Sequence, residues 1–417
     1  MSFPKEYPEQ RYTATHSQPM NTPTAKNLTQ RFNLKFDPHT YRRIIGKKEV
    51  VIHCHHYNAR LQNIIEGTKQ INGKAIILSA AEEIFSDYIH NFFEPEDTLA
   101  DKWQIAAKLY AHLGYGCLDF SQISQGIVTS SSSHFVEGWK AGFIESNCPV
   151  CTFTEGYLQG VIHGITGESV YVREKACMNM GADTCQFIID QSRTNSITYP
   201  PQRSLNFKSK PTSQFAKSNI DEGKIINALV EMPFYGNNQG LVPAFNVYLA
   251  NTPADFYNLI CIRFMESMKK QGLFSTAKNL LLFAGEVCAV NTLRGIIISA
   301  EWYELIAPMV QEESDNLYGL IAVTNALGWG NWHVINYEPG ERLQMEALNG
   351  YEALGYLEYK GEAKEPQCFT LTGVAAGIMA LLHGEGTVEE RVGTYASEES
   401  QCICCQETSC KFQVELL

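Results

Sequence analysis

The chain of 417 residues lacks several features that mark common classes of protein. It has no run of 18 uncharged apolar residues, so we expect no membrane-spanning helix. Its first residues, Met1 to Pro8, contain no apolar core of a secretory signal, so we expect a cytoplasmic protein. A basic excess is also missing, because 33 lysines and arginines face 45 acidic residues and the net charge is −12. Phosphate binding needs a basic surface, so we expect no nucleic acid partner.

Motifs of common enzymes and activators are absent as well. We find no Gly-x4-Gly-Lys-Ser/Thr phosphate loop and no Gly-x-Gly-x-x-Gly sequence that opens a strand–helix unit. Neither a Ser-His-Asp order nor a metal site with an open coordination position emerges, and no DNA-binding helix-turn-helix is recognisable. We therefore expect a protein that is not an enzyme.

Cysteine, by contrast, is abundant. Thirteen cysteines in a chain without a signal peptide indicate thiols and metal ligands rather than disulfides. Four residues follow the pattern Cys-x22-Glu-x2-Cys-x7-Cys, namely Cys151, Glu174, Cys177 and Cys185. Three thiolates and one carboxylate complete a tetrahedral set for zinc, and thiolates disfavour magnesium and calcium. With no open coordination position, such a site is structural rather than catalytic.

The same Glu-x2-Cys-x7-Cys ending recurs at the C-terminus, with a cysteine upstream. This second set is Cys368, Glu399, Cys402 and Cys410. Cys404 and Cys405 crowd it and offer alternative ligands. The sequence therefore predicts two structural zinc sites, with buried cysteines that act as small apolar residues as the alternative.

Other anchors recur in the same order, which indicates an internal repeat. Leu113-Gly-Tyr-Gly116 returns as Leu327-Gly-Trp-Gly330, and Gly138-Trp139 returns as Gly355-Tyr356. Ala81-Glu82 returns as Gly285-Glu286, so an acid recurs within each apolar helix. Buried capping, a pocket role and simple exposure are all open for these two acids.

We predict four segments from the repeat and from composition. They are a flexible arm over 1–30, a first domain over 31–190, a linker over 191–222 and a second domain over 223–417. Prolines, serines and basic residues such as Arg193 and Lys217 are typical of a solvated linker, although contact with an anionic membrane surface is the alternative.

Each domain is predicted to be α/β (α+β), with an antiparallel sheet, packed helices and a closing metal-bound hairpin. The expected helices span 57–66, 75–92, 99–112 and 154–165 in the first domain and 245–270, 278–298, 301–313 and 371–382 in the second. The expected strands span 116–127, 169–176 and 184–190 in the first and 317–323, 330–337, 392–401 and 409–416 in the second.

The cysteine ending, its upstream cysteine and the Gly138-Trp139 pair resemble the 4-vinyl reductase-like domain, a zinc-containing module that binds small molecules. The resemblance covers both halves and is most specific over 138–187. It implies a fold related to a vesicle-tethering subunit with a hydrophobic acyl channel. It also implies a ligand pocket beside the zinc site, with the metal holding the pocket wall. Zinc carries no redox chemistry, so the name "reductase" is not carried over as an activity.

In the sensor branch of this family, residues near the Gly-Trp segment contact the ligand. The resemblance therefore points to Trp139 and His134 in the first copy and to Tyr356 in the second. His163, in the small-residue helix, is a further candidate, with a hydrogen-bonded helix-end histidine as the alternative. His53-Cys-His-His56 could ligate a metal or a tetrapyrrole, with local polar packing as the alternative.

A stand-alone protein with two copies resembles proteins of photosynthetic bacteria and cyanobacteria. The resemblance implies a non-enzymatic protein that binds a hydrophobic tetrapyrrole, chlorophyll or its precursor, and assists pigment delivery or photosystem assembly. Its partners would be photosystem subunits or assembly factors, with peripheral contact at the thylakoid membrane. A ligand sensor or scaffold without pigment is one alternative, and an accessory subunit of a tetrapyrrole-metabolising enzyme is another. The copies could also pair as a pseudo-dimer, or the chain as a homodimer.

Overall fold

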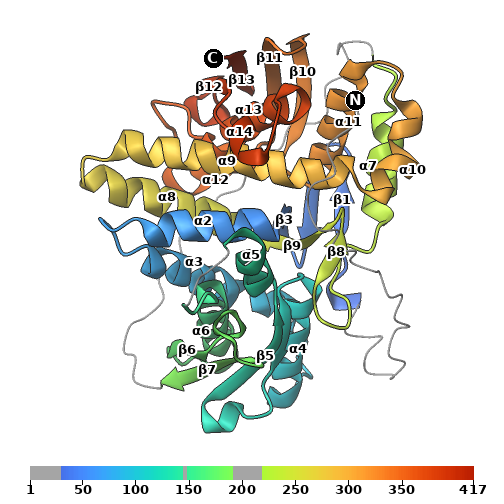
Figure 1. The fold of residues 1–417 in the computed structure, drawn as a ribbon. Helices are drawn as coiled ribbons and strands as arrows, with labels where there is room; N and C mark the ends of the chain where they lie inside the picture. Colours follow the sequence, from blue (N-terminus) through green and yellow to red (C-terminus); the bar gives the residue numbers. More distant parts are fainter. Residues whose placement is uncertain (1–29, 144–147, 191–217) are drawn as a thin grey trace.

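The computed structural model describes residues 30–143, 148–190 and 218–417. The green part of the first half and the red part of the second half lie on opposite sides of a central layer of helices, to which both halves contribute (Figure 1). The predicted arm and most of the predicted linker, with its basic residues, lie outside the described residues. Their roles stay predictions.

The first half runs β1 Lys35–Asp37, β2 Arg42–Ile45, β3 Lys48–Cys54, α2 His55–Gly67, α3 Gly73–Tyr88, α4 Leu99–His112, β4 Gly116–Asp119, β5 Ile127–Ser133, α5 His134–Gly142, α6 Thr152–Thr166, β6 Tyr171–Ala176 and β7 Cys185–Asp190. The second half begins with α7 Glu222–Glu231 and runs β8 Val242–Ala244, β9 Val247–Pro253, α8 Ala254–Lys270, α9 Phe274–Ile297, α10 Ala300–Leu305, α11 Glu313–Ala326, β10 Asn331–Glu338, β11 Arg342–Leu348, α12 Tyr351–Lys360, α13 Phe369–His383, α14 Val388–Arg391, β12 Tyr395–Gln401 and β13 Cys410–Leu416.

Each half contains a four-stranded antiparallel sheet with the same connectivity. The first sheet has the order β4-β5-β7-β6 and the second has the order β10-β11-β13-β12. In both, the last two strands form the closing hairpin. This confirms the predicted mixed α/β architecture with antiparallel sheets and packed helices.

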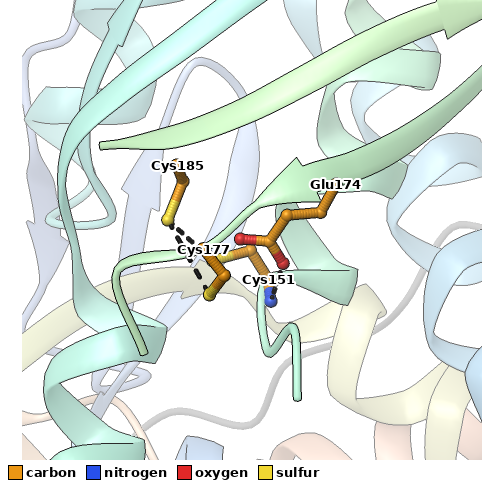
Figure 2. A group of neighbouring side chains, drawn as sticks. All are labelled: Cys151, Glu174, Cys177 and Cys185. Carbon is orange, nitrogen blue, oxygen red and sulfur yellow. Dashed lines mark hydrogen bonds between the residues drawn. The ribbon is translucent and has the colours of Figure 1, made fainter. Parts of the chain in front are cut away.

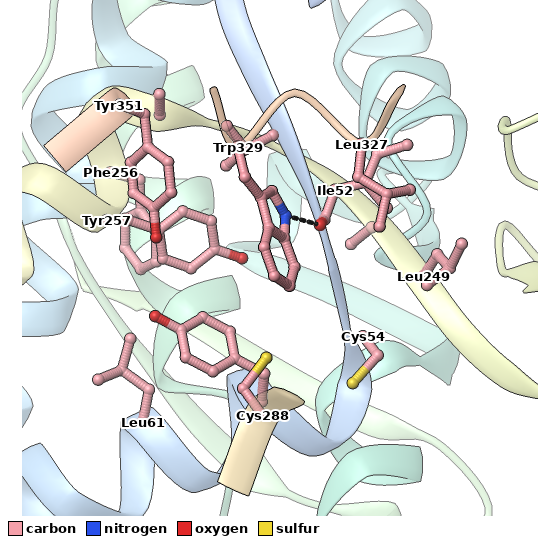
Figure 3. Packing of buried hydrophobic residues seen from close by; sticks show 14 of the residues in the cluster. Ile52, Cys54, Leu61, Leu249, Phe256, Tyr257, Cys288, Leu327, Trp329 and Tyr351 are labelled. Carbon is pink, nitrogen blue, oxygen red and sulfur yellow. Dashed lines mark hydrogen bonds between the residues drawn. The ribbon is translucent and has the colours of Figure 1, made fainter. Parts of the chain in front are cut away.

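A third sheet joins the two halves. Its order is β1-β2-β3-β9-β8, and β3 pairs with β9 so that Ile52 lies opposite Asn251. Each of these two strands leads directly into a helix, α2 after β3 and α8 after β9. The helices cross over, because α2 packs on α9 of the other half and α8 packs on α3. Figure 3 shows the buried aromatic core where the halves meet.

Glycines allow the closest helix pairs of each half to form. A Cβ on Gly156 or Gly160 of α6 would meet the backbone of α3, and a Cβ on Gly373 or Gly377 of α13 would meet the backbone of α9. The small residues on these helix faces therefore allow close backbone packing. Without a Cβ at these points the helix axes approach more closely than larger side chains allow.

The two recurring acids are both buried in these helices. Glu82 accepts a hydrogen bond from Nε2 of Gln159 at 2.9 Å, and Glu286 accepts one from the backbone N–H of Gly393 at 2.7 Å. Each carboxylate thus ties its apolar helix to a neighbouring segment, and simple exposure is wrong for both.

Three predicted elements of the second half are wrong. The helix expected over 245–270 begins only at Ala254, because β9 occupies Val247–Pro253. The helix expected over 301–313 ends at Leu305, because Pro308 cannot continue a helical hydrogen-bond ladder. The strand expected over 317–323 lies inside α11. That helix is buried on nearly every face, so its apolar residues form a continuous run that periodicity cannot distinguish from a buried strand.

The strand expected over 116–127 is also wrong in detail. Only its start forms a strand, β4, which ends at Asp119. A short 3-10 turn over Ile123–Gln125 follows, and β5 begins at Ile127, where the expected strand ends. Gly126 ends this turn at φ +75°, a conformation that favours glycine.

Helix α9 is long and apolar enough to cross a membrane by length and composition. Within the protein, however, 72% of its most apolar window is buried. It packs on α13, α2 and α8, so its composition is that of a central core helix.

Candidate metal centres and ligand cavity

The first predicted ligand set comes together at the closing hairpin of the first half (Figure 2). One donor atom from each of Cys151, Glu174, Cys177 and Cys185 lies within 4.8 Å of every other. The sulfur of Cys151 lies 3.7 Å from that of Cys185, which lies 4.0 Å from that of Cys177. The three thiols are buried.

The second set repeats this arrangement. Cys368, Glu399, Cys402 and Cys410 also offer donor atoms within 4.8 Å of one another. The three sulfurs form a near-equilateral triangle, with 3.8 Å between Cys368 and Cys402 and 3.7 Å for each of the other two edges. A tetrahedral ion with zinc–sulfur bonds of about 2.3 Å would place its sulfurs about 3.8 Å apart. The triangle therefore has the dimensions of one face of a zinc tetrahedron.

Local structure explains how the hairpins hold these donors. Cys177 and Cys402 each begin a short 3-10 turn that joins the last two strands. The fourth ligand of each set, Cys151 or Cys368, is the N-cap of the small-residue helix α6 or α13. A bound ion would therefore tie the start of a helix to the end of a sheet.

Each carboxylate has one oxygen engaged and one left over. Oε2 of Glu174 accepts the backbone N–H of Cys151 at 2.9 Å, and Oε2 of Glu399 accepts that of Cys368 at 2.8 Å. Oε1 of each is buried and has no hydrogen-bond partner within the described part of the chain. A buried polar atom is rarely left without a partner, so these two oxygens are suited to a cation.

The electrostatics of the clusters lead to the same conclusion. Burial, together with Cys177, raises the pKa of Glu174 to about 8, and burial together with Cys402 raises the pKa of Glu399 to about 9. Hydrogen bonds from Cys151 and Cys185 lower the pKa of Cys177. The clusters favour one thiolate but resist further negative charge, which a divalent cation would neutralise. Both can hold a metal ion such as zinc.

The second half also contains a cavity of about 620 Å³. Its walls come from α8, α12, the first residues of α9 and α13, and the loop over 362–367. Met265, Phe274, Tyr356 and Phe369 supply apolar and aromatic surface. The volume lies within the range of about 300–1,000 Å³ that is typical of small-molecule sites.

This cavity lies against the second metal cluster. Gln367 and Phe369, which line the cavity, flank the ligand Cys368 in the chain. The cavity loop is also tied to the hairpin turn, because the backbone N–H of Ala363 donates to the carbonyl of Cys404 at 2.8 Å. Nε2 of Gln406 donates to Glu362 at 2.7 Å. The hairpin that would hold the ion thus also holds one wall of the cavity.

The inner end of the cavity is polar. The carboxylate of Glu352 accepts backbone N–H groups of Thr370 and Leu371 at 3.2 and 2.9 Å, which caps the start of α13. Burial raises the pKa of Glu352 to about 7. Oδ1 of Asn258, a side chain that is 4% exposed, has no hydrogen-bond partner among the residues the structure places. Sequence analysis missed both residues, although an acid within the apolar helix segment 351–357 was a readable signal.

The predicted ligand-contact residues fall in different places. Tyr356 lines the cavity. Trp139 is buried beside Phe143, with 4.8 Å between ring centroids. His134 is buried, with Nε2 2.8 Å from Nδ2 of Asn58. His163 lies in the last turn of α6, with Nδ1 3.4 Å from the hydroxyl of Ser169. The roles of all four in ligand binding stay predictions.

His53 lies in the core between the halves. Its ring stacks against Tyr57 and Trp329, with centroid distances of 4.2 and 4.8 Å. Burial lowers its pKa to about 3, so it is neutral near physiological pH. Packing, rather than metal ligation, accounts for its position.

Comparison with known proteins found a match in the part of the chain that contains the first metal cluster. Residues 134–191 match the family model of the 4-vinyl reductase domain, and the match spans α5, α6 and the closing hairpin. This stretch of the chain is similar to that domain family. None of the curated proteins matches the chain.

One solved structure that matches is the phenol-responsive sensory domain of the transcription activator PoxR, determined with phenol. It is 12% identical with a TM-score of 0.35, over 47% of this chain and 90% of that domain. A TM-score this low carries nothing about the ligand of this protein.

Proposed function

We propose that this 4-vinyl reductase-like protein binds a small molecule in the cavity of its second half and does not itself catalyse a reaction. The observation that carries the proposal is the cavity of about 620 Å³ whose wall is tied to a metal-capable cluster. Apolar and aromatic walls with a few polar groups at one end are typical of ligand sites.

In this proposal zinc occupies both clusters and serves structure. When bound, it would neutralise the thiolates and cross-link each hairpin to the helix that follows the upstream cysteine. We further propose that the chain is a tandem pair of 4-vinyl reductase-like domains over 31–190 and 223–417, joined as a pseudo-dimer by the β3–β9 pairing. The matching sheet orders and matching clusters support this.

Ligand binding can be tested with Prodan, a neutral fluorophore without hydrogen-bond donors whose emission shifts in apolar surroundings. The proposal predicts saturable binding at one site per chain. Ala363→Trp, which fills the cavity, should abolish the shift, whereas Ala396→Trp on the exposed face of β12 should retain it. Equal binding by both variants would place the fluorophore elsewhere and count against the proposal.

The finer proposal is that the ligand is a tetrapyrrole and that the protein assists pigment delivery or photosystem assembly at the thylakoid surface. Aromatic walls from Phe274, Tyr356 and Phe369 suit a planar ring. An absorption spectrum of the protein from a chlorophyll-making host tests this directly. Blue and red bands that co-elute at a fixed ratio to the chain support it, and a colourless zinc-loaded protein favours a sensor or scaffold instead.

A further inference from the structure

We infer that the ligand of the second-half cavity presents a neutral or cationic hydrogen-bond donor to the polar inner end, and that anionic ligands are excluded. This inference rests on the proposed function, because it names the class of molecule that the cavity takes.

Within the described chain, Asn258 has an unpaired amide oxygen at the inner end of the cavity. Its side chain is almost fully buried, it lines the cavity, and its Oδ1 accepts no hydrogen bond from the described chain. An amide oxygen that is buried and unpaired costs free energy relative to one that accepts a hydrogen bond. A donor on the ligand, such as a hydroxyl or an ammonium, would remove that cost, whereas a carboxylate would repel the oxygen.

A carboxylate lies in the same cavity wall as Asn258. Glu352 lines the same cavity, and both of its oxygens already accept backbone N–H groups of α13. Carboxylate oxygens have further lone pairs, so Glu352 can accept from a ligand but, once ionised, cannot donate to one. The inner end therefore offers acceptors from two side chains.

The cavity walls carry more acidic than basic side chains. Four glutamates and two lysines line the cavity, namely Glu266, Glu352, Glu362, Glu365, Lys269 and Lys364. Lys360 pairs with Glu266 at 2.5 Å, which leaves three glutamates against the two lysines that line the cavity. The remaining balance is acidic, and it disfavours anions at the entrance as well as at the inner end.

Among its described residues, the first half lacks hydrogen-bond acceptors at the two positions that form this polar inner end. Gly138 of α5 packs on Ala59 of α2, and the equivalent Gly355 of α12 packs on Asn258 of α8. Phe135, on α5, takes the place that Glu352 has on α12. The first half thus has apolar side chains at the two positions where the second half has acceptors.

A matched series of probes tests the inference. We would measure the binding of 1-naphthylmethylamine, 1-naphthylmethanol and 1-naphthoate by titration calorimetry at about pH 8, where Glu352 is mostly ionised. The amine and the alcohol should bind about tenfold tighter than the acid, since one charge-assisted hydrogen bond is worth roughly that factor.

Two variants of the inner end sharpen the test. Asn258→Leu should weaken the amine and the alcohol about fivefold or more relative to Prodan, which has no hydrogen-bond donor that could lose a partner. Asn258→Asp should strengthen the amine and weaken the acid further. The inference would be overturned if naphthoate bound as tightly as the amine, or if Asn258→Leu had no effect on any naphthyl probe. In either case, Prodan binding would leave the proposed function standing. Failure of Prodan and all three naphthyl probes to bind would overturn both.

Discussion

The indole Nε1 of Trp329 donates a hydrogen bond to the carbonyl oxygen of Ile52 across 2.7 Å (Figure 3). Trp329 belongs to the Leu-Gly-Trp-Gly segment of the second half, and Ile52 belongs to β3 of the first. The backbone N–H of Ile52 also donates to the carbonyl of Leu327 at 3.0 Å. The recurring Leu-Gly-Trp-Gly segment is therefore hydrogen-bonded to β3 of the opposite half, a contact that we call a joint.

The first half makes the reciprocal joint. The backbone N–H of Asn251 donates to the carbonyl of Leu113 at 2.8 Å, and the hydroxyl of Tyr115 lies 3.4 Å from the carbonyl of Asn251. Because Ile52 lies opposite Asn251 in the β3–β9 pair, both joints meet at one point of the shared sheet. Each half thus supplies hydrogen-bond partners to a strand that the other half contributes to the shared sheet.

The two joints should differ in strength. Trp329→Phe removes the 2.7 Å hydrogen bond and part of a fully buried ring, so we expect it to lower the free energy of unfolding by about 2 kcal/mol. Tyr115→Phe keeps the ring and removes a long hydrogen bond to Asn251 together with an interaction with Thr252, so it should cost about 1 kcal/mol. Urea unfolding of both variants measures the difference, and a larger loss for Tyr115→Phe would contradict the account.

Metal content should follow the two clusters independently. We expect two zinc ions per chain, because the chain has two complete donor sets. Cys151→Ser and Cys368→Ser should each leave one ion, because each loses one thiolate from a different set. Cys148→Ser, at an exposed thiol outside both sets, is the control and should leave both ions. Elemental analysis after gel filtration checks this, and full zinc content in Cys368→Ser would show that Cys404 substitutes for it.

The helix pair α9–α13 should not tolerate a methyl group at its closest point. A Cβ on Gly373 would lie 1.9 Å from the carbonyl oxygen of Leu282, so Gly373→Ala must push the helices apart. We expect a loss of about 2–3 kcal/mol in unfolding free energy. Gly142→Ala, which meets nothing within 4 Å, is the control and should change stability by less than about 0.5 kcal/mol. Thermal unfolding of the two variants provides the comparison.

We expect low pH to weaken the hydrogen bonds between Asp315 and Asn219, which lies in the segment before α7. Burial alone would raise the pKa of Asp315, but hydrogen bonds from Asn219 and from the backbone of Gln311 and Glu312 outweigh it and lower that pKa to about 2. A lowered carboxyl pKa stabilises the folded state above the unfolded value of 3.8, and that stability is lost as the pH falls towards 2.

Asp315→Asn provides the control for this pH effect. Between about pH 5 and pH 2 the wild type should lose on the order of 1–2 kcal/mol more than the variant. Unfolding measured in urea across this range checks the prediction. Parallel pH profiles for the two proteins would show that Asp315 does not carry the effect.

The metal clusters were predictable from the sequence because their signal is a spacing that recurs. Glu174-x2-Cys177 and Glu399-x2-Cys402 occupy equal places on two hairpins, so chemistry and order coincide. The helices with clear ends were predictable too, and α4 spans the expected 99–112, where Thr98 and Asp101 form a capping box.

The cavity could not be predicted in the same way. Its walls bring together Asn258, Glu352 and the loop over 362–367, which are far apart in sequence and meet only because α8 packs on α12. The shared sheet was hidden for a similar reason. The pairing of β3 with β9 joins residues about two hundred positions apart, and no local pattern encodes it.

The measurement that tests the central claim most directly compares Prodan binding before and after metal removal. The cavity wall is tied to the second cluster, so chelator-treated protein and Cys368→Ser should both lose binding about tenfold or more, because the loop over 362–367 loses its anchor. Cys151→Ser, at the remote first cluster, should bind as the wild type does. Unchanged binding by the zinc-free protein and by Cys368→Ser would contradict the claim that the metal site holds the ligand cavity.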